Sequence, residues 1–137
     1  MPEASFPATL DRLEDMLTFI LDVAAQQGLP QDAVTKVRLA AEEVLVNIIN
    51  HAYPDGAGEI DIACAPADDG SRSLVLEIRD TGLPFNPLER EDPDISLPME
   101  DRQIGGLGIF LVKKVMDDIQ YTREGDMNIL KLVKHGS

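Results

Sequence analysis

The segment from Leu39 to Tyr53 constrains the fold most, because it combines a helical apolar pattern with polar residues that an apolar helix does not need. At about 100° of rotation per residue, one face carries the apolar residues Val37, Ala41, Val44, Ile48 and Ala52. Glu43 and Asn47 are four residues apart and share a second facet, with Asn50 beside them and His51 bordering the apolar stripe. The pattern predicts a buried helix with a polar seam. A solvated helix face and a ligand site are both open interpretations of that seam.

Charge and length limit the classes of function. The chain has 137 residues, enough for one domain (1–137) with a substantial core. Its net charge of −13 disfavours a broad surface for the phosphates of nucleic acid, so we expect no direct nucleic-acid partner. The same charge suits a basic protein partner, or a site that neutralises phosphate with a metal ion.

The cysteine content and the hydropathy concern the environment of the chain. Cys64 is the single cysteine, which excludes an internal disulfide, and its strand-like surroundings predict a buried thiol. We identify no signal peptide and no apolar run of about 20 residues. The expectation is a cytoplasmic protein without membrane contact.

The periodicity in the first half predicts two helices followed by two strands. Apolar spacings of three and four predict a helix from about Thr9 to Gln27, with Thr9 or Ser5 as its cap, and a second helix from Pro30 to about His51. Alternation predicts a strand at Glu59–Ala65, a hairpin connection at Ala67–Ser71, and a strand through Leu74, Leu76 and Ile78 that ends at Asp80.

The second half predicts a long loop, a helix and two further strands. Residues 81–104 show no periodicity and contain four prolines, which is typical of a lid, a binding loop or disorder. A helix is expected at Ile109–Met116, and strands at Ile119–Thr122 and Ile129–Val133 around a Gly125–Asp126 turn. Short strand connections favour an antiparallel or mixed sheet with helices on one face, which is an α+β two-layer sandwich.

Two short motifs could bind a ligand, although each has an ordinary structural interpretation. Asp80 and Gly82 follow a strand and could form a plain turn, while Gly105-Gly-Leu-Gly108 could be a cluster of helix-capping glycines. Glycines at the start of a helix also let phosphate oxygens approach the free amides. No Lys-Ser/Thr pair follows them, so this is not a P-loop, and no βαβ unit supports a Rossmann fingerprint.

Together the motifs resemble the GHKL (Bergerat-fold) ATPases. The resemblance rests on Glu43-x-x-x-Asn47, Asp80-x-Gly82, the long loop and Gly105-Gly-Leu-Gly108, in that order, and covers about Leu10 to Val133. The extended motifs Glu-x-x-x-Asn-x-x-x-His-Ala-Tyr and Gly-Gly-Leu-Gly-Ile-x-Leu are most similar to the anti-sigma-factor serine/threonine kinase branch.

The resemblance implies a role for each matching residue. Asn47 is expected to hold Mg²⁺ on the phosphates of ATP, and Glu43 to orient or deprotonate the attacking hydroxyl. Asp80 is expected to accept the adenine amino hydrogen, with Gly82 leaving room for the base. The other expected nucleotide-binding residues are His51, Gly105, Gly106, Leu107 and Gly108, and residues 83–104 are expected to form the ATP lid.

One position departs from the family pattern. Relatives often carry an arginine just before the phosphate-binding glycines, whereas this chain has Arg102-Gln-Ile-Gly105. Three alternatives are open: the positive charge is displaced to Arg102, supplied by Lys113, or absent. Phosphoryl transfer relies on such electrostatic help, so this position bears on the rate more than on nucleotide binding.

The resemblance implies an ATP-dependent serine/threonine protein kinase that phosphorylates an anti-anti-sigma (antagonist) protein and regulates a sigma factor or similar target by partner switching. It also implies a homodimer. One alternative is a binding module that uses ATP to switch partners without phosphoryl transfer. Another is a detached histidine-kinase-like ATPase domain, but no dimerisation helix with a phospho-acceptor histidine precedes this one.

Overall fold

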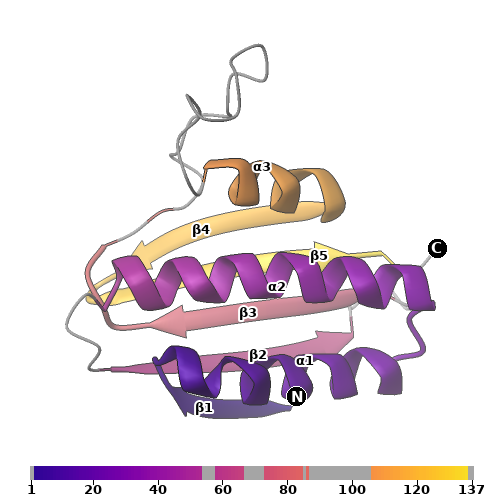
Figure 1. Ribbon diagram of the computed structural model, residues 1–137, viewed down its shortest axis with the longest axis horizontal. Coiled ribbons are helices and arrows are strands. Elements are labelled where there is room, and N and C mark those ends of the chain that lie inside the picture. The colour runs from indigo at the N-terminus through magenta and orange to yellow at the C-terminus, as the bar shows by residue number, and fades with distance from the viewer. Residues whose placement is uncertain (1, 54–57, 67–72, 85, 87–105, 136–137) are drawn as a thin grey trace.

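The computed structural model describes residues 2–53, 58–66, 73–84, 86 and 106–135. Figure 1 shows the helices lying together on one side of a sheet. The elements in chain order are β1 (Glu3–Pro7), the 3₁₀ turn η1 (Leu10–Arg12), α1 (Leu13–Gln26), α2 (Gln31–His51), β2 (Glu59–Pro66), β3 (Leu74–Asp80), α3 (Gly106–Val115), β4 (Asp118–Glu124) and β5 (Met127–Lys134). In the described residues, no helix combines the length and hydrophobicity needed to cross a membrane.

The sheet has the strand order β1-β2-β3-β5-β4, and all four pairings between these strands are antiparallel. The predicted α+β sandwich with helices on one face is therefore confirmed, in its antiparallel rather than its mixed form. Because β5 lies between β3 and β4, strands from opposite ends of the second half become neighbours. Asp80 on β3 is thereby aligned with Asn128 on β5.

Alternation along the strands selects the face that packs against the helices. On β3 the residues Leu74, Leu76, Ile78 and Asp80 are buried, while the residues between them are half-buried. The helices supply Met16, Leu17, Ile20, Val37, Val44 and Leu45, all fully enclosed. Burying one such aliphatic side chain contributes about 1.5–3 kcal/mol. Asp80 therefore continues a hydrophobic row as its one charged member.

Cys64 belongs to this core, as expected. Its side chain is fully buried on β2, and burial raises the pKa of the thiol to about 12. A thiol that resists ionisation is a poor nucleophile and a poor metal ligand. Cys64 therefore contributes to packing.

The structure corrects the predicted boundaries near the N-terminus. β1 was not predicted, because a five-residue edge strand has too few alternating positions to be seen without its partner β2. The first helix begins as a 3₁₀ turn, and neither proposed cap forms a capping bond. Thr9 makes no side-chain cap hydrogen bond, and Ser5 lies in β1, where its hydroxyl donates to Asp61.

The last helix also differs from the prediction. It begins at Gly106, three residues earlier than expected, and ends at Val115. The first amides of a helix have no partner within it, so glycines near the start sacrifice little hydrogen bonding. The predicted strands at the C-terminus are confirmed and longer, and Gly125 takes a φ of 60° at the first turn position, as a type II′ hairpin requires. The predicted hairpin connection 67–71 and most of the predicted lid lie outside the described residues.

Candidate functional site

Three of the predicted motifs lie at one end of the molecule. The C-terminal half of α2, the end of β3 and the start of α3 are all on the left in Figure 1. Two hydrogen bonds fasten α2 to the residues after β3: Leu83 N donates to Ala52 O at 2.9 Å, and Thr81 N donates to the Tyr53 hydroxyl at 2.9 Å. The fold therefore brings the Asp80 motif to the end of the helix that carries Glu43 and Asn47.

Asn47 is buried, with 7% of its surface exposed, yet it is incompletely paired. Its Nδ2 donates to the backbone oxygen of Glu43 at 2.7 Å. Since a carbonyl can only accept, this bond turns the amide oxygen the other way. In the described part of the chain, Arg79 Nε is the only fully enclosed side-chain nitrogen or oxygen without a hydrogen-bond partner. The amide oxygen of Asn47 has no hydrogen-bond partner among the described residues and is therefore available to a cation.

Glu43 and His51 differ in their placement along α2. Glu43 is half-buried one turn before Asn47, and its carboxylate makes no hydrogen bond or ion pair with the described residues. His51 is the last residue of the helix and is exposed. Glu43 and Asn47 thus remain together on one side of the helix, as predicted, while His51 lies at its end.

Asp80 is 4% exposed at the end of β3. Its Oδ1 accepts two hydrogen bonds of 2.9 Å, one from Gly82 N and one from Asn128 Nδ2. Desolvation by burial raises the pKa of Asp80, against the lowering effects of those two bonds and of the charge of Arg123. Both printed donors bond to Oδ1, so Oδ2 has no hydrogen-bond partner among the described residues and is available to a ligand.

Gly82 has a packing reason that the sequence did not reveal. A Cβ at this position would lie 2.5 Å from the backbone oxygen of Ala52. Only glycine therefore allows the turn after Asp80 to approach the end of α2. The expected role of Gly82 beside a base stays a prediction.

Asn128, Tyr121 and Arg123 were missed by the sequence analysis. Asn128 donates to Asp80 and accepts hydrogen bonds from the Tyr121 hydroxyl and from Arg123 Nη1. The available signal was alternation, because Asn128 precedes Leu130 and Leu132 at core positions of one strand. Beginning that strand at Ile129 concealed the pattern.

The glycine segment is partly described. Gly106, Leu107 and Gly108 lie in the first turn of α3, which places their backbone at the end of the helix that faces the site. Gly105 and Arg102 lie outside the described residues. Lys113, the alternative source of positive charge, is half-buried further along α3 and already has an interaction partner.

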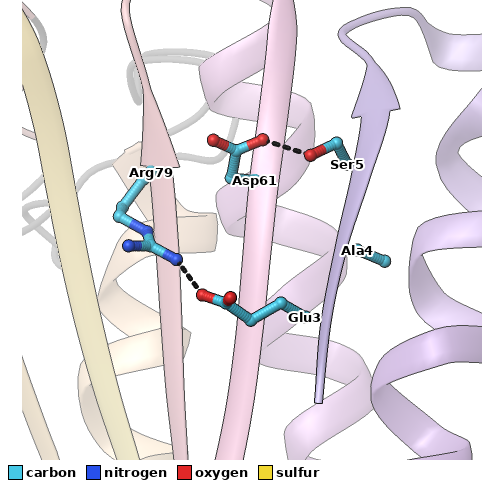
Figure 2. Close-up of a pocket in the computed structure, with 5 residues that line it drawn as sticks. All are labelled: Glu3, Ala4, Ser5, Asp61 and Arg79. Carbon is cyan, nitrogen blue, oxygen red and sulfur yellow. Dashed lines mark hydrogen bonds and ion pairs between the residues drawn. The ribbon is translucent and has the colours of Figure 1, made fainter. Parts of the chain in front are cut away.

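A separate pocket lies on the opposite face of the sheet. It has a volume of about 230 Å³ and is lined by Glu3, Ala4, Ser5, Asp61 and Arg79. Figure 2 shows these side chains already engaged with one another, Arg79 with Glu3 and Ser5 with Asp61. None of the predicted site residues lines this pocket, so it is not the nucleotide site.

The sequence profile of the histidine kinase-like ATPase domain matches residues 6–134. The chain belongs to this family. The resemblance inferred from the motifs is thus confirmed, and with it the use of ATP by a kinase-like ATPase domain.

In the described residues no group of three or more His, Cys, Asp or Glu side chains could hold a metal ion by itself.

Curated relatives agree with the predicted activity. The chain is 32% identical over 132 residues to a protein of Bacillus cereus named serine-protein kinase RsbW, covering 93% of this chain and 81% of the relative. A protein of the same name from Bacillus thuringiensis subsp. konkukian matches with the same identity and coverage.

Solved structures share the fold at low identity. The RsbU and RsbW domains of a Mycobacterium tuberculosis protein align with a TM-score of 0.66 at 16% identity, covering 98% of this chain and 32% of that chain. The SiaB–SiaC complex from Pseudomonas aeruginosa aligns with a TM-score of 0.59 at 13% identity, covering 98% and 89%. At these identities the likeness concerns the fold alone.

Proposed function

We propose that this protein is an ATP-dependent serine/threonine protein kinase that phosphorylates an anti-anti-sigma (antagonist) protein and controls a sigma factor or similar target by partner switching. The observation that carries the proposal is the pair on α2: among the described residues, neither the amide oxygen of Asn47 nor the carboxylate of Glu43, one turn away, has a partner. The serine-kinase name of the curated relatives supports the type of reaction.

The nucleotide would be bound at both of its ends. Asp80 Oδ2, which has no partner among the described residues, is an acceptor that suits the amino group of adenine. The free amides at the start of α3 suit phosphate oxygens, because the helix dipole favours negative charge there. His51, at the end of α2, borders the same region.

The residues present fit a magnesium ion with one protein ligand. Mg²⁺ commonly takes one or two protein oxygens and completes its shell with water and substrate phosphates. The open Oδ1 of Asn47 meets that need. When bound, the ion would neutralise the charge of the phosphates.

Glu43 would act on the protein substrate. Its carboxylate would take the proton from the serine or threonine hydroxyl as that oxygen bonds to the γ-phosphorus. The bond from the γ-phosphorus to the bridging oxygen then breaks, and ADP leaves. Burial of Asn47 beside Glu43 limits the movement of this part of α2, which keeps the base in position.

Partner switching follows if nucleotide state and phosphorylation bias two competing complexes. The net charge of −13 favours partners with basic surfaces. A homodimer, which the family resemblance implies, and a cytoplasmic location, which the sequence leads us to expect, belong to the proposal.

Transfer of label from γ-labelled ATP tests the proposal. The protein is incubated with Mg²⁺ and candidate antagonist proteins encoded nearby, and label is expected on a serine or threonine of the antagonist. Glu43→Gln should slow this transfer by about 10²–10⁴-fold, because a positioned general base contributes that much. ATP affinity should stay within a few-fold, since glutamine keeps nearly the same shape.

Glu42→Gln is the matched control. Glu42 is exposed and projects about 100° away around α2, so this variant should transfer phosphate at the wild-type rate. Equal rates for Glu43→Gln and wild type would contradict the mechanism. If wild type changes partner affinity with ATP but never transfers phosphate, the binding-module alternative replaces the kinase.

A further inference from the structure

Asp80 is the first member of a row of polar side chains across three neighbouring strands. The register aligns Asp80 on β3 with Asn128 on β5, and Asn128 with Arg123 on β4. All three side chains are on the face that packs against the helices, and Asn128 is 4% exposed. Burying polar residues at such depth costs stability unless they are paired, so these side chains must find hydrogen-bond partners within the fold.

Asn128 has an unambiguous amide orientation. Its Nδ2 donates to Asp80 Oδ1 and to the backbone oxygen of Leu83, both at 2.9 Å. Its Oδ1 accepts from Arg123 Nη1 at 3.2 Å and from the Tyr121 hydroxyl. A guanidinium cannot accept and a backbone carbonyl cannot donate, so the reversed amide would break these contacts.

This orientation determines which Asp80 oxygen meets a ligand. The two donors, Asn128 Nδ2 and Gly82 N, both bond to Oδ1, whereas Oδ2 has no partner among the described residues and is left for a ligand. Arg123 reinforces the arrangement, because its Nη1 also donates to the backbone oxygen of Gly82 at 3.1 Å. The carboxylate is thereby fixed against rotation.

We propose that Asn128, held by Tyr121 and Arg123, is a positioning residue that sets nucleobase specificity by dedicating one Asp80 oxygen to the protein and the other to the base. The proposal rests on the proposed function and deepens it. A base that donates a hydrogen from its 6-position can bond to Asp80 Oδ2. A base with a 6-carbonyl is disfavoured, because its oxygen and Asp80 Oδ2 are both acceptors and repel each other.

The geometry predicts an inversion of polarity. In Asp80→Asn the inward donors still require an oxygen, so the new amide oxygen should take the place of Oδ1. The new NH₂ group is then forced outward, where it can donate to a 6-carbonyl but repels an amino group. The same inward bonds are kept, so the fold should be preserved.

Calorimetry with three nucleotides tests this directly. ATP has a 6-amino group, inosine triphosphate has a 6-carbonyl, and purine riboside triphosphate has neither. Wild type should prefer ATP to inosine triphosphate by about 10- to 100-fold, the range for a hydrogen bond to a charged group. Asp80→Asn should reverse the preference, while both proteins bind purine riboside triphosphate with similar affinity.

Asn128→Leu tests the positioning role. The preference for ATP over purine riboside triphosphate should fall about tenfold, and purine riboside triphosphate affinity should change less than twofold. Gln120→Leu is the control, because this exposed amide on β4 donates only to Asp118 among the bonds of the described residues. It should behave like wild type.

The outcomes separate this inference from the proposed function. If wild type binds no nucleotide, the proposed function fails. If wild type binds ATP but Asn128→Leu weakens all three nucleotides equally, or leaves the preference unchanged, Asn128 has no role in specificity. If Asn128→Leu does not fold, Asp80→Asn decides: a variant that still prefers ATP, or shows no preference, overturns the inference.

Discussion

At the scale of single residues, the proposed site contains two buried polar side chains that each keep one atom without a partner among the described residues. That atom is the amide oxygen of Asn47 and the Oδ2 of Asp80, while their other polar atoms bond within the fold. Burying a partly paired polar group costs stability, and burying a charged one costs more. We interpret this loss of stability as a consequence of holding the ligand-binding atoms in a defined direction.

Asp80→Asn should separate stability from binding. Burial raises the pKa of Asp80, so the carboxyl group of Asp80 binds its proton more tightly in the folded protein than in the unfolded chain. Its contribution to stability is present below the unfolded pKa and is lost as the pH rises through the folded value. At neutral pH the variant should therefore unfold in urea at a concentration at least as high as wild type. As the pH falls toward 4, the urea concentration that unfolds wild type should rise relative to the concentration that unfolds the variant.

Asp22→Asn serves as the control for this measurement, because Asp22 is exposed on α1. It should give the same difference from wild type at both pH values. A difference between wild type and Asp80→Asn that is independent of pH would contradict the assigned burial of the carboxylate.

At the scale of elements, the two ends of α3 differ in their surroundings. Its first turn contains the glycines of the proposed phosphate site. At its other end Lys134 Nζ donates to Val115 O at 2.8 Å and pairs with Asp117 at 3.3 Å. Desolvation raises the pKa of Asp117, but hydrogen bonds from His135 N and Lys134 outweigh it and lower that pKa overall. The ammonium group thus stabilises the negative end of the helix dipole.

Lys134→Met should release the C-terminal end of α3. The methionine keeps the apolar stem but leaves Val115 O without this donor, which should cost about 1–3 kcal/mol. Urea unfolding would measure the loss, and amide hydrogen exchange should accelerate in the last turn of α3. Lys131→Met, on the exposed face of the same strand, should do neither. Equal effects of the two variants would show that the cap contributes nothing specific.

At the scale of the whole molecule, one sheet layer and one helix layer share a single core. We therefore predict one cooperative unfolding transition for the full chain, and a higher midpoint with ATP and Mg²⁺. A ligand at 100 times its Kd adds about 2.7 kcal/mol, which corresponds to roughly 8–10 °C for a chain of this size. Scanning calorimetry checks both points, with Asp80→Asn expected to lose most of the ATP effect. Two separate transitions, or no shift with ATP, would contradict the prediction.

Elements whose signal is local could be predicted from the sequence alone. The 3.6-residue pattern located α2, and alternation located β3 with Asp80 at its end, because each depends only on neighbours along the chain. The order of the motifs was also enough to predict the family, since Glu43, Asn47, Asp80 and the glycines have the spacing that is typical of it.

Features that depend on the register between distant strands could not be predicted from the sequence. The pairing of β5 with β3 places Asn128 beside Asp80, 48 positions earlier in the chain, and the pairing with β4 adds Arg123. Likewise, Gly82 is required because the end of α2 approaches it, and β1 is a strand because β2 pairs with it. These features arise from contacts between segments whose local patterns do not encode which partner they meet.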